Sequence, residues 1–209
     1  MDTVIAALLF VVLALYLITV KEKYRGGDYW VLVRGGVAGF GMVAFSFLVQ
    51  SLLDQLMVPS NLWNAFIYAS GVEEGLKLLL LNLLVFRGEG LRTPYDYIKV
   101  SLVASFVFAG IENLLYVKIY YAPEGLDVAA LRMYTAIPMH ALCGTSLGYL
   151  MWKRRSHNAG YALIRAFLVP WMIHGVYDFC AFEEELLVMI GVLVFACFLN
   201  LGAIRSYLR

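Results

Sequence analysis

The sequence predicts an all-α fold: a polytopic membrane helix bundle of about seven transmembrane helices, with the amino terminus outside the cell and the carboxyl terminus in the cytoplasm. Three observations predict this fold class. Of the 209 residues, 62% are hydrophobic and 15% are charged, against about 45–50% and about 25% in a soluble domain. The hydrophobic residues form long, mostly uncharged runs. The basic residues gather in alternate connections between those runs.

Apolar runs long enough to cross a bilayer occupy about residues 4–20, 34–53, 62–86, 97–119, 131–151, 161–181 and 185–205. A hydrocarbon core needs roughly 20 helical residues per crossing, so these runs and their short connections use nearly the whole chain. We therefore expect residues 1–209 to form a single integral-membrane domain, a multi-pass protein of the cell membrane. The longest connection, around Tyr121 to Ala130, is polar enough to be a surface loop.

The basic residues of the connections predict the orientation, because lysine and arginine are retained on the cytoplasmic side during insertion. All but three of the 16 lysines and arginines fall on one side of the predicted bundle. Lys77 lies inside the third run, and Lys118 and Arg132 lie on the other side, together with the acidic run Glu183–Glu185. This asymmetry places the amino end outside.

The overall charge limits the class of partner. The formal net charge is +1, whereas a nucleic-acid-binding protein driven by counterion release needs many cations clustered on one face. We expect the lipid bilayer as a partner and no nucleic acid.

Ionisable residues interrupt the third to sixth apolar runs. A charged side chain at the centre of a bilayer costs about 2.5–3.5 kcal/mol, so these side chains are expected to face the interior of the bundle and to meet one another there. The ionisable residues are Glu73, Glu74, Lys77, Glu112, His140, His174 and Asp178. For all of them except Glu74 and Lys77, counting residues from the outer helix ends places the side chain between the midplane and the outer surface.

The spacing of these residues favours shared helix faces. Lys77 follows Glu73 by four residues and Glu74 by three, and both spacings bring side chains together on a helix, so Lys77 can pair with either carboxylate. His174 and Asp178 are also four residues apart. Their imidazole and carboxylate are expected on one face.

Several of these residues also have a structural interpretation. Glu74 with Lys77 can be a neutralising ion pair, and either histidine taken singly can form a hydrogen bond between helices. Asn113 is expected to be a packing residue. Together, however, carboxylates and imidazoles on four consecutive predicted helices favour a functional site, because ionisable residues inside a membrane are functional candidates by default.

The residue types fit peptide hydrolysis. A glutamate in a poorly solvated site can take a proton from water and return it to a leaving amine, and a histidine beside a carboxylate can stabilise an oxyanion or orient that water. The same donors can instead hold a divalent metal that activates the water. The HExxH motif of common zinc peptidases is absent from the sequence, and the donor set alone leaves both mechanisms open.

Four motifs occur in an order that resembles the PrsW family of intramembrane proteases. They are EExxK at 73–77, FxxxEN from Phe108 to Asn113, a histidine followed by glycines at His140, and HxxxD at 174–178. The motif-bearing helices occupy about residues 62–181. The PrsW family belongs with the CPBP group, which includes the type II CAAX prenyl proteases.

The resemblance implies a multi-pass protease that cuts a membrane-anchored protein. PrsW proteins are associated with the first, extracytoplasmic cut of a membrane-anchored anti-sigma factor. An anti-sigma factor is therefore the expected substrate class, and the expected cleavage lies near the extracytoplasmic face, on the side toward which the polar cluster is predicted to open.

The resemblance also implies roles for individual residues. In the CPBP group the first glutamate of the EE pair activates the water and the second pairs with a basic residue on the same helix. Carried over, Glu73 is the base and Glu74 pairs with Lys77. His174 and Asp178 are the candidates for stabilising and orienting the oxyanion.

One position departs from the prenyl proteases. Glu112 stands where their FxxxH motif has a histidine, which argues against a prenyl substrate and supplies a further carboxylate. Glu73, Glu112, His140 and His174 can then form one metal site. On family analogy we favour a metal-free glutamate mechanism with no cofactor over a divalent metal such as zinc. Phe108, Asn113 and Lys77 are expected to support the site.

Two other functional classes share these residue types. Chains of glutamate, histidine and aspartate also serve as proton relays in transporters, but the inverted repeats typical of transporters are not evident in the sequence. A cofactor protein would need His140 and His174 to face each other around a haem. Proteolysis remains the favoured function.

Overall fold

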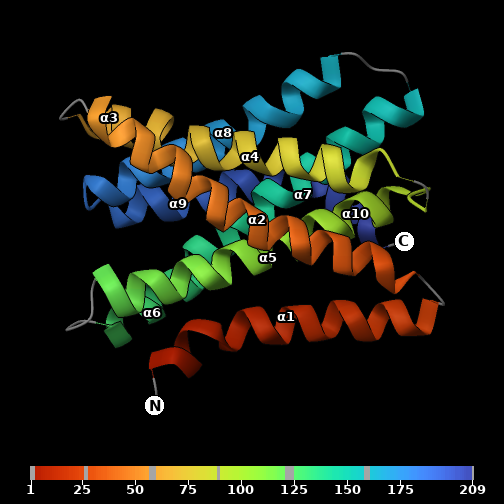
Figure 1. The fold of residues 1–209 in the computed structure, drawn as a ribbon, viewed down its shortest axis with the longest axis horizontal. Helices are drawn as coiled ribbons and strands as arrows, with labels where there is room; N and C mark the ends of the chain where they lie inside the picture. The colour runs from red at the N-terminus through yellow and green to blue at the C-terminus, as the bar shows by residue number, and fades with distance from the viewer. Residues whose placement is uncertain are drawn as a thin grey trace.

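The computed structural model describes residues 3–25, 28–56, 60–88, 90–120, 125–157 and 161–208, and within these ranges the regular elements are helices, with no strand. The helices lie roughly along one common axis (Figure 1). The longer helices are α1 (Thr3–Arg25), α2 (Tyr29–Leu53), α4 (Ser70–Leu81), α5 (Pro94–Leu115), α6 (Gly125–Tyr134), α7 (Ala136–His157), α8 (Tyr161–Phe182), α9 (Leu186–Leu199) and α10 (Leu201–Leu208).

Short 3₁₀ and π-helical segments extend several of these helices. The short helix α3 (Asn61–Trp63) and the π-helix η2 (Asn64–Ala69) lead directly into α4, and the π-helix η3 (Asn82–Phe86) follows it. The π-helix η4 (Tyr116–Tyr120) extends α5, and the 3₁₀ segment η1 (Asp54–Leu56) follows α2. The third and fourth predicted spans therefore correspond to continuous rods.

Three of the predicted elements differ from the structure: one connection and two spans. Tyr121 and the three residues after it lie outside the described ranges, but the rest of the expected surface loop is helix α6, so the loop prediction is wrong there. A turn at Thr135 separates α6 from α7, and a second turn at Asn200 separates α9 from α10. The expected fifth and seventh spans are thus each divided between two helices.

Helix α5 lies at the centre of the bundle and contacts α1, α2, α4, α7 and α10. A capping box fixes its start: the Thr93 hydroxyl accepts from the Asp96 amide, the Asp96 carboxylate accepts from the Thr93 amide, and Pro94 occupies the first turn.

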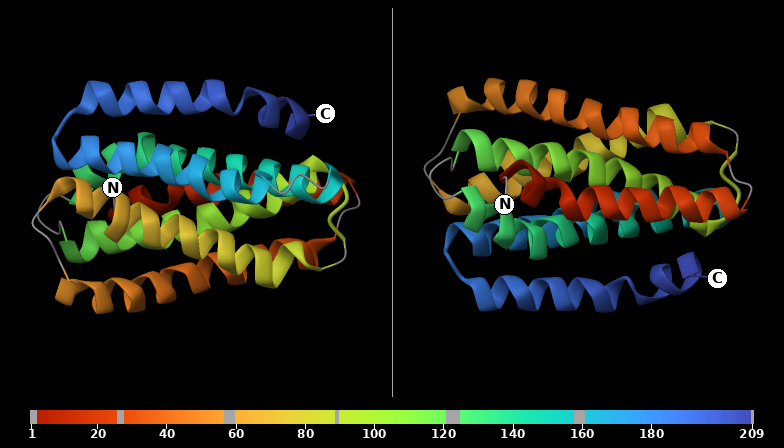
Figure 2. Two further views of the ribbon diagram at one scale, coloured as in Figure 1. Left: turned by 90° about the horizontal axis from the view of Figure 1, so that it is seen from above. Right: turned by 90° about the horizontal axis from the view of Figure 1, so that it is seen from below.

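Views from above and below show α2 and the α9–α10 pair on opposite sides of the bundle (Figure 2). The core helices are thereby enclosed.

Glycines on α7 allow that helix to pack closely on α5. A Cβ atom added at Gly148 would lie 2.6 Å from the Tyr97 carbonyl oxygen and 2.8 Å from the Ile98 Cα. A Cβ at Gly144 would collide with the Ser105 hydroxyl. Small residues at helix crossings are typical of membrane bundles, and this contact fixes α7 against α5.

Two helices of the described part are long and apolar enough to cross a membrane by length and composition: Tyr29–Leu53 and Pro94–Ile119, each with a mean hydropathy of 1.8. Ala7–Lys21 and Leu186–Leu199 are shorter apolar helices. Large apolar side chains are exposed along α1, α2 and α9, for example Leu187 on α9 at 83%. Such apolar surface is typical of contact with lipid. The number of spans and their orientation stay predictions.

The connections gather at the two ends of the bundle. One end holds the start of α1, the end of α2, the start of α6 and the turn from α8 to α9, and the opposite end holds the carboxyl end of α10 (Figure 1). The acidic turn of Glu183–Glu185 lies at the first end. We refer to this end, which the basic residues predict to face outside, as the α6 end.

Candidate active site

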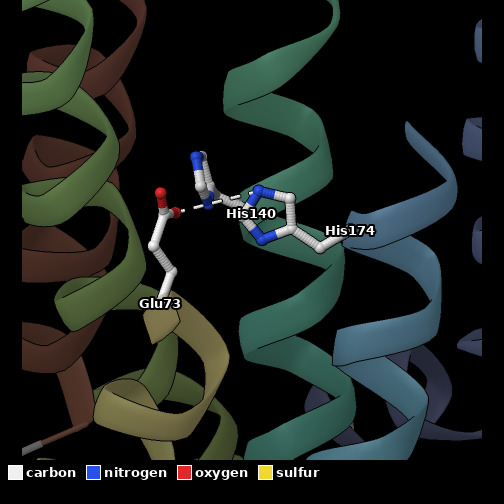
Figure 3. Close-up of side chains that lie close together, drawn as sticks. All are labelled: Glu73, His140 and His174. Atoms are coloured by element: carbon white, nitrogen blue, oxygen red, sulfur yellow. Dashed lines mark ion pairs between the residues drawn. The ribbon is translucent and has the colours of Figure 1, made fainter. Parts of the chain in front are cut away.

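Three side chains from three different helices converge inside the bundle. Glu73 lies on α4, His140 on α7 and His174 on α8, and all three are buried. Figure 3 shows the three side chains pointing toward one another. One donor atom from each can be chosen so that all three lie within 4.8 Å of one another. We call these residues the central triad.

His174 is surrounded by three carboxylates. Its Nδ1 lies 2.9 Å from Glu74 Oε1, a distance at which the ring N–H donates to the carboxylate. Its Nε2 lies 3.3 Å from Asp178 Oδ2 and 3.8 Å from Glu73 Oε2. The spacing of HxxxD thus places Asp178 beside the ring, as the sequence predicts.

Lys77 pairs with Glu74. Its Nζ lies 2.5 Å from Glu74 Oε1, and both side chains are completely enclosed. The spacing left open which of the two glutamates Lys77 joins, and the structure assigns it to the one three residues away. Glu73 is left facing the histidines, with a buried Oε2 that has no hydrogen-bond partner.

His140 has an arrangement similar to that of His174. Its Nε2 lies 3.0 Å from Glu112 Oε2, while its Nδ1 is buried without a hydrogen-bond partner. The ring meets His174 edge to face at a centroid distance of 4.9 Å. Phe108 also packs edge to face on the His140 ring, at a centroid distance of 5.3 Å. Each histidine therefore has one ring nitrogen bonded to a carboxylate, Glu74 for His174 and Glu112 for His140. The second ring nitrogen takes no part in that bond.

Glu112 is held by Arg132 on α6. The guanidinium Nη2 lies 2.7 Å from Glu112 Oε2, and its Nε donates to Asn113 Oδ1 at 3.0 Å. The guanidinium also stacks 3.8 Å from the centre of the Tyr116 ring. The Asn113 amide in turn donates to the Ala7 carbonyl at 2.8 Å, which ties this group to α1. Asn113 thus supports the site through packing and hydrogen bonding.

Arg132 was counted in the sequence analysis only as a basic residue of a connection. Two signals point to it: it falls just inside the predicted fifth apolar run, and the carboxylates expected in the bundle outnumber Lys77. A buried excess of carboxylate requires a cation or a proton. Its position over Glu112 depends on α6 folding against α5, which no local pattern predicts.

The charges of this cluster do not cancel. Glu73, Glu74, Glu112 and Asp178 are all at least four-fifths buried, and the described cations that pair with them are Lys77 and Arg132. With neutral histidines and ionised carboxylates, two negative charges remain. Uncompensated charge inside a membrane is costly, so the site favours a divalent cation or additional protons.

The central triad fits a divalent metal. Two imidazoles and one carboxylate are a common ligand set for catalytic zinc, which leaves a fourth position for water or substrate. Metal-binding histidines usually donate their other N–H to a carboxylate, and His174 and His140 have such partners in Glu74 and Glu112. Glu112 itself is not part of the triad, because it is held by Arg132 and His140. The structure thus groups three of the four residues considered as metal ligands.

A cavity of about 390 Å³ leads to the triad. Its lining includes Glu73, Glu112, His140, His174 and Asp178, together with side chains of α6 and of the turn from α8 to α9. The cavity therefore lies toward the α6 end of the bundle, where the depth count from the sequence places the polar cluster.

Comparisons with known proteins agree with this site. A family model described as PrsW family intramembrane metalloprotease matches residues 27–201. The chain is similar to proteins named Protease PrsW. The one from Oceanobacillus iheyensis is 29% identical over 154 aligned positions, which cover 72% of this chain and 69% of the relative.

Two further relatives carry the same name. The Clostridioides difficile protein is 25% identical over 224 aligned positions, which cover 100% of this chain and 92% of the relative. The Geobacillus kaustophilus protein is 28% identical and covers 79% of this chain and 73% of the relative. No solved structure matches the chain.

Proposed function

Because this chain belongs to the PrsW family of intramembrane proteases, we propose that it hydrolyses a peptide bond of a membrane-anchored protein at the central triad. The observation that carries the proposal is the convergence of Glu73, His140 and His174 within 4.8 Å of one another beside a cavity. Peptide hydrolysis needs a group that activates water and a group that stabilises an oxyanion. The carboxylate and the imidazoles of the triad can supply both groups. Membership of the family favours proteolysis over the proton relay of a transporter.

We propose that the cut falls near the extracytoplasmic face. The position of the cavity at the α6 end supports this placement, since the basic residues lie mainly at the opposite end. The family resemblance implies that the substrate is a membrane-anchored anti-sigma factor and that the proposed cleavage is the first cut made in it.

A divalent metal such as zinc is the cofactor that we propose. Glu73, His140 and His174 would hold it, and the two uncompensated negative charges of the cluster support a cation of charge two. A bound ion of this kind supplies Lewis-acid polarisation of the carbonyl and makes a bound water more acidic. This proposal departs from the metal-free mechanism favoured by sequence analogy.

The remaining residues act through positioning and proton exchange. Glu74 and Glu112 accept from one nitrogen of His174 and His140 and so fix the tautomer and orientation of each ring. Lys77 and Arg132 neutralise these two carboxylates. Asp178 lines the cavity, and its buried Oδ2 has no hydrogen-bond partner, so it is placed to exchange a proton with water or with the leaving amine.

The metal-free glutamate mechanism has an observation of its own. Three carboxylates lie around the His174 ring, a surrounding that also suits a protonated imidazolium. In that mechanism Glu73 takes the proton of the water and returns it to the leaving amine, while His174 stabilises the oxyanion. Both mechanisms require the central triad, and metal removal separates them.

The function is tested in cells that express the protein with a single-pass reporter whose outer segment carries a tag. We expect wild-type protein to release the tag and Glu73→Gln to lower release by about 10³-fold or more, because one essential group of a catalytic unit is lost. Glu185→Gln, which changes an exposed carboxylate that does not line the cavity, is the matched control and keeps full activity. Mass spectrometry of the fragment locates the cut.

Release by Glu73→Gln at the wild-type rate, with equal expression and helix content, would overturn the assignment. A cut on the cytoplasmic side of the reporter would overturn the proposed location while leaving the protease function intact.

A further inference from the structure

A second cavity adjoins the first at the central triad. It has a volume of about 300 Å³ and lies between α2, η2 and the end of α5. The two cavities share five wall residues, among them Glu73 and Glu112. The catalytic carboxylate therefore stands at the junction of two cavities, one lined mainly by α6, α7, α8 and α9 and the other mainly by α2, η2 and α5.

The second cavity contains a buried hydroxyl group without a partner. Ser46 on α2 lines this cavity, is 4% exposed, and its Oγ makes no hydrogen bond. Serine inside a helix usually donates to the carbonyl four residues earlier. Ser51 on the same helix does so, with its hydroxyl 2.8 Å from the Phe47 carbonyl. Ser46 is thus available to a group that enters the cavity.

A protein substrate brings groups that need such a partner. A peptide bond inside a helix is shielded, so the segment to be cut must be unwound and extended at the junction. Each unwound backbone N–H and C=O then lacks its helical partner, and in a membrane every such group costs several kcal/mol unless the protein satisfies it. A buried, unpaired hydroxyl beside the catalytic carboxylate meets this requirement.

We propose that the two cavities are the two halves of one substrate groove, and that Ser46 binds the substrate backbone on the α2 side of the scissile bond. The inference rests on the proposed proteolytic function and extends it. The substrate is an unwound, extended segment that passes from one cavity to the other across Glu73. Ser46 donates its hydroxyl proton to a backbone carbonyl of that segment.

The walls of the second cavity also indicate a side-chain preference. Val43, Phe47, Phe108 and Leu115 give it apolar walls, while Gln50 and Tyr68 are polar residues of the same lining. A substrate residue held there is expected to carry an apolar side chain. The acidic and basic groups of the site instead lie along the junction and the first cavity.

Kinetics of reporter cleavage in liposomes test the role of Ser46. The probe is a single-pass peptide whose cleavage position has been located by mass spectrometry. We expect Ser46→Ala to raise KM about 2- to 10-fold with little change in kcat, the effect of one neutral hydrogen bond lost from substrate binding. Ser51→Ala, and Ser105→Ala for a buried hydroxyl that lines neither cavity, are matched controls with unchanged KM. An unchanged KM in Ser46→Ala overturns the role of Ser46.

Cross-linking tests the groove itself. In a protein whose three native cysteines are replaced by alanine, single cysteines are placed by Ser46→Cys in the second cavity or Ala181→Cys in the first, with Glu73→Gln to prevent cleavage. Reporter peptides carry one cysteine on either side of the scissile bond, and copper phenanthroline serves as oxidant. We expect the two sites to form disulfides with opposite sides of the bond.

Disulfides from both sites to the same side of the scissile bond, or none from Ser46→Cys while Ala181→Cys forms its own, overturn the proposal. Failure of the inference is distinguishable from failure of the proposed function. Wild-type protein that cuts no membrane-anchored reporter contradicts the function, whereas an active protein whose Ser46 variants behave as their controls contradicts only the groove.

Discussion

At the scale of single residues, each histidine of the central triad is held by its own carboxylate and each of those carboxylates by its own cation. Lys77, Glu74 and His174 form one such chain, and Arg132, Glu112 and His140 form the other. The first chain lies within two helices close to one another, whereas the second joins α5, α6 and α7. This arrangement leaves Glu73 and Asp178 as the carboxylates without a paired lysine or arginine.

Arg132→Met tests the second chain. The substitution leaves Glu112 largely buried beside His140 without its cation, and breaking one partner of such a pair costs about 3–5 kcal/mol. We expect a lower midpoint of thermal unfolding in detergent, and partial recovery in the double variant Glu112→Gln with Arg132→Met. Arg165→Met on the exposed surface of α8 is the control and stays close to wild type. Equal midpoints for Arg132→Met and Arg165→Met would show that the pair is not structurally required.

Spacing predicts the contacts made within a helix, and it predicts few of the contacts made between helices. The HxxxD spacing placed Asp178 beside His174 because both lie on one face of α8. It could not decide between Glu73 and Glu74 as the partner of Lys77, since both spacings are compatible with a helix. The sequence did not predict Arg132 or Ser46 as site residues, because the role of each depends on the neighbours that distant segments place beside it.

At the scale of the elements, the glycine contact between α5 and α7 fixes where His140 lies relative to Glu112. The predicted apolar runs located the main helices well, since their length and composition are local properties. The division at Thr135 and the helix α6 were not predicted. The polar residues of this connection indicate a loop, and a short helix there is stable only when it packs against neighbouring helices.

Gly148→Ala tests the contact between α5 and α7. The added methyl group would lie 2.6 Å from the Tyr97 carbonyl oxygen, so one of the two helices must move. Overpacking of this kind costs about 1–3 kcal/mol, and we expect a lower unfolding midpoint together with reduced cleavage as His140 shifts. Gly191→Ala on α9, where no atom lies within 4 Å, is the control and keeps both properties. A Gly148→Ala protein as stable as the control would mean that the two helices tolerate separation.

At the scale of the whole molecule, the bundle combines an apolar exterior with a charged interior that opens toward one end. Composition predicted an all-helical membrane protein, and counting residues from the span ends predicted that the polar cluster would lie toward the α6 end. The family match shows a protease of the membrane. The excess of two negative charges in the cluster can be counted only in the folded molecule. It depends on which carboxylates pair with Lys77 and Arg132, and these are Glu74 and Glu112.

Metal content and activity, measured on the same purified protein, test the central claim that the triad holds a divalent ion. We expect about one ion per chain, loss of cleavage after chelation and recovery when zinc is returned, with little metal retained by a variant carrying His140→Ala and His174→Ala. Metal-free protein that cleaves the reporter at the full rate, before and after chelation, would contradict the claim and leave Glu73 to activate the water without a metal.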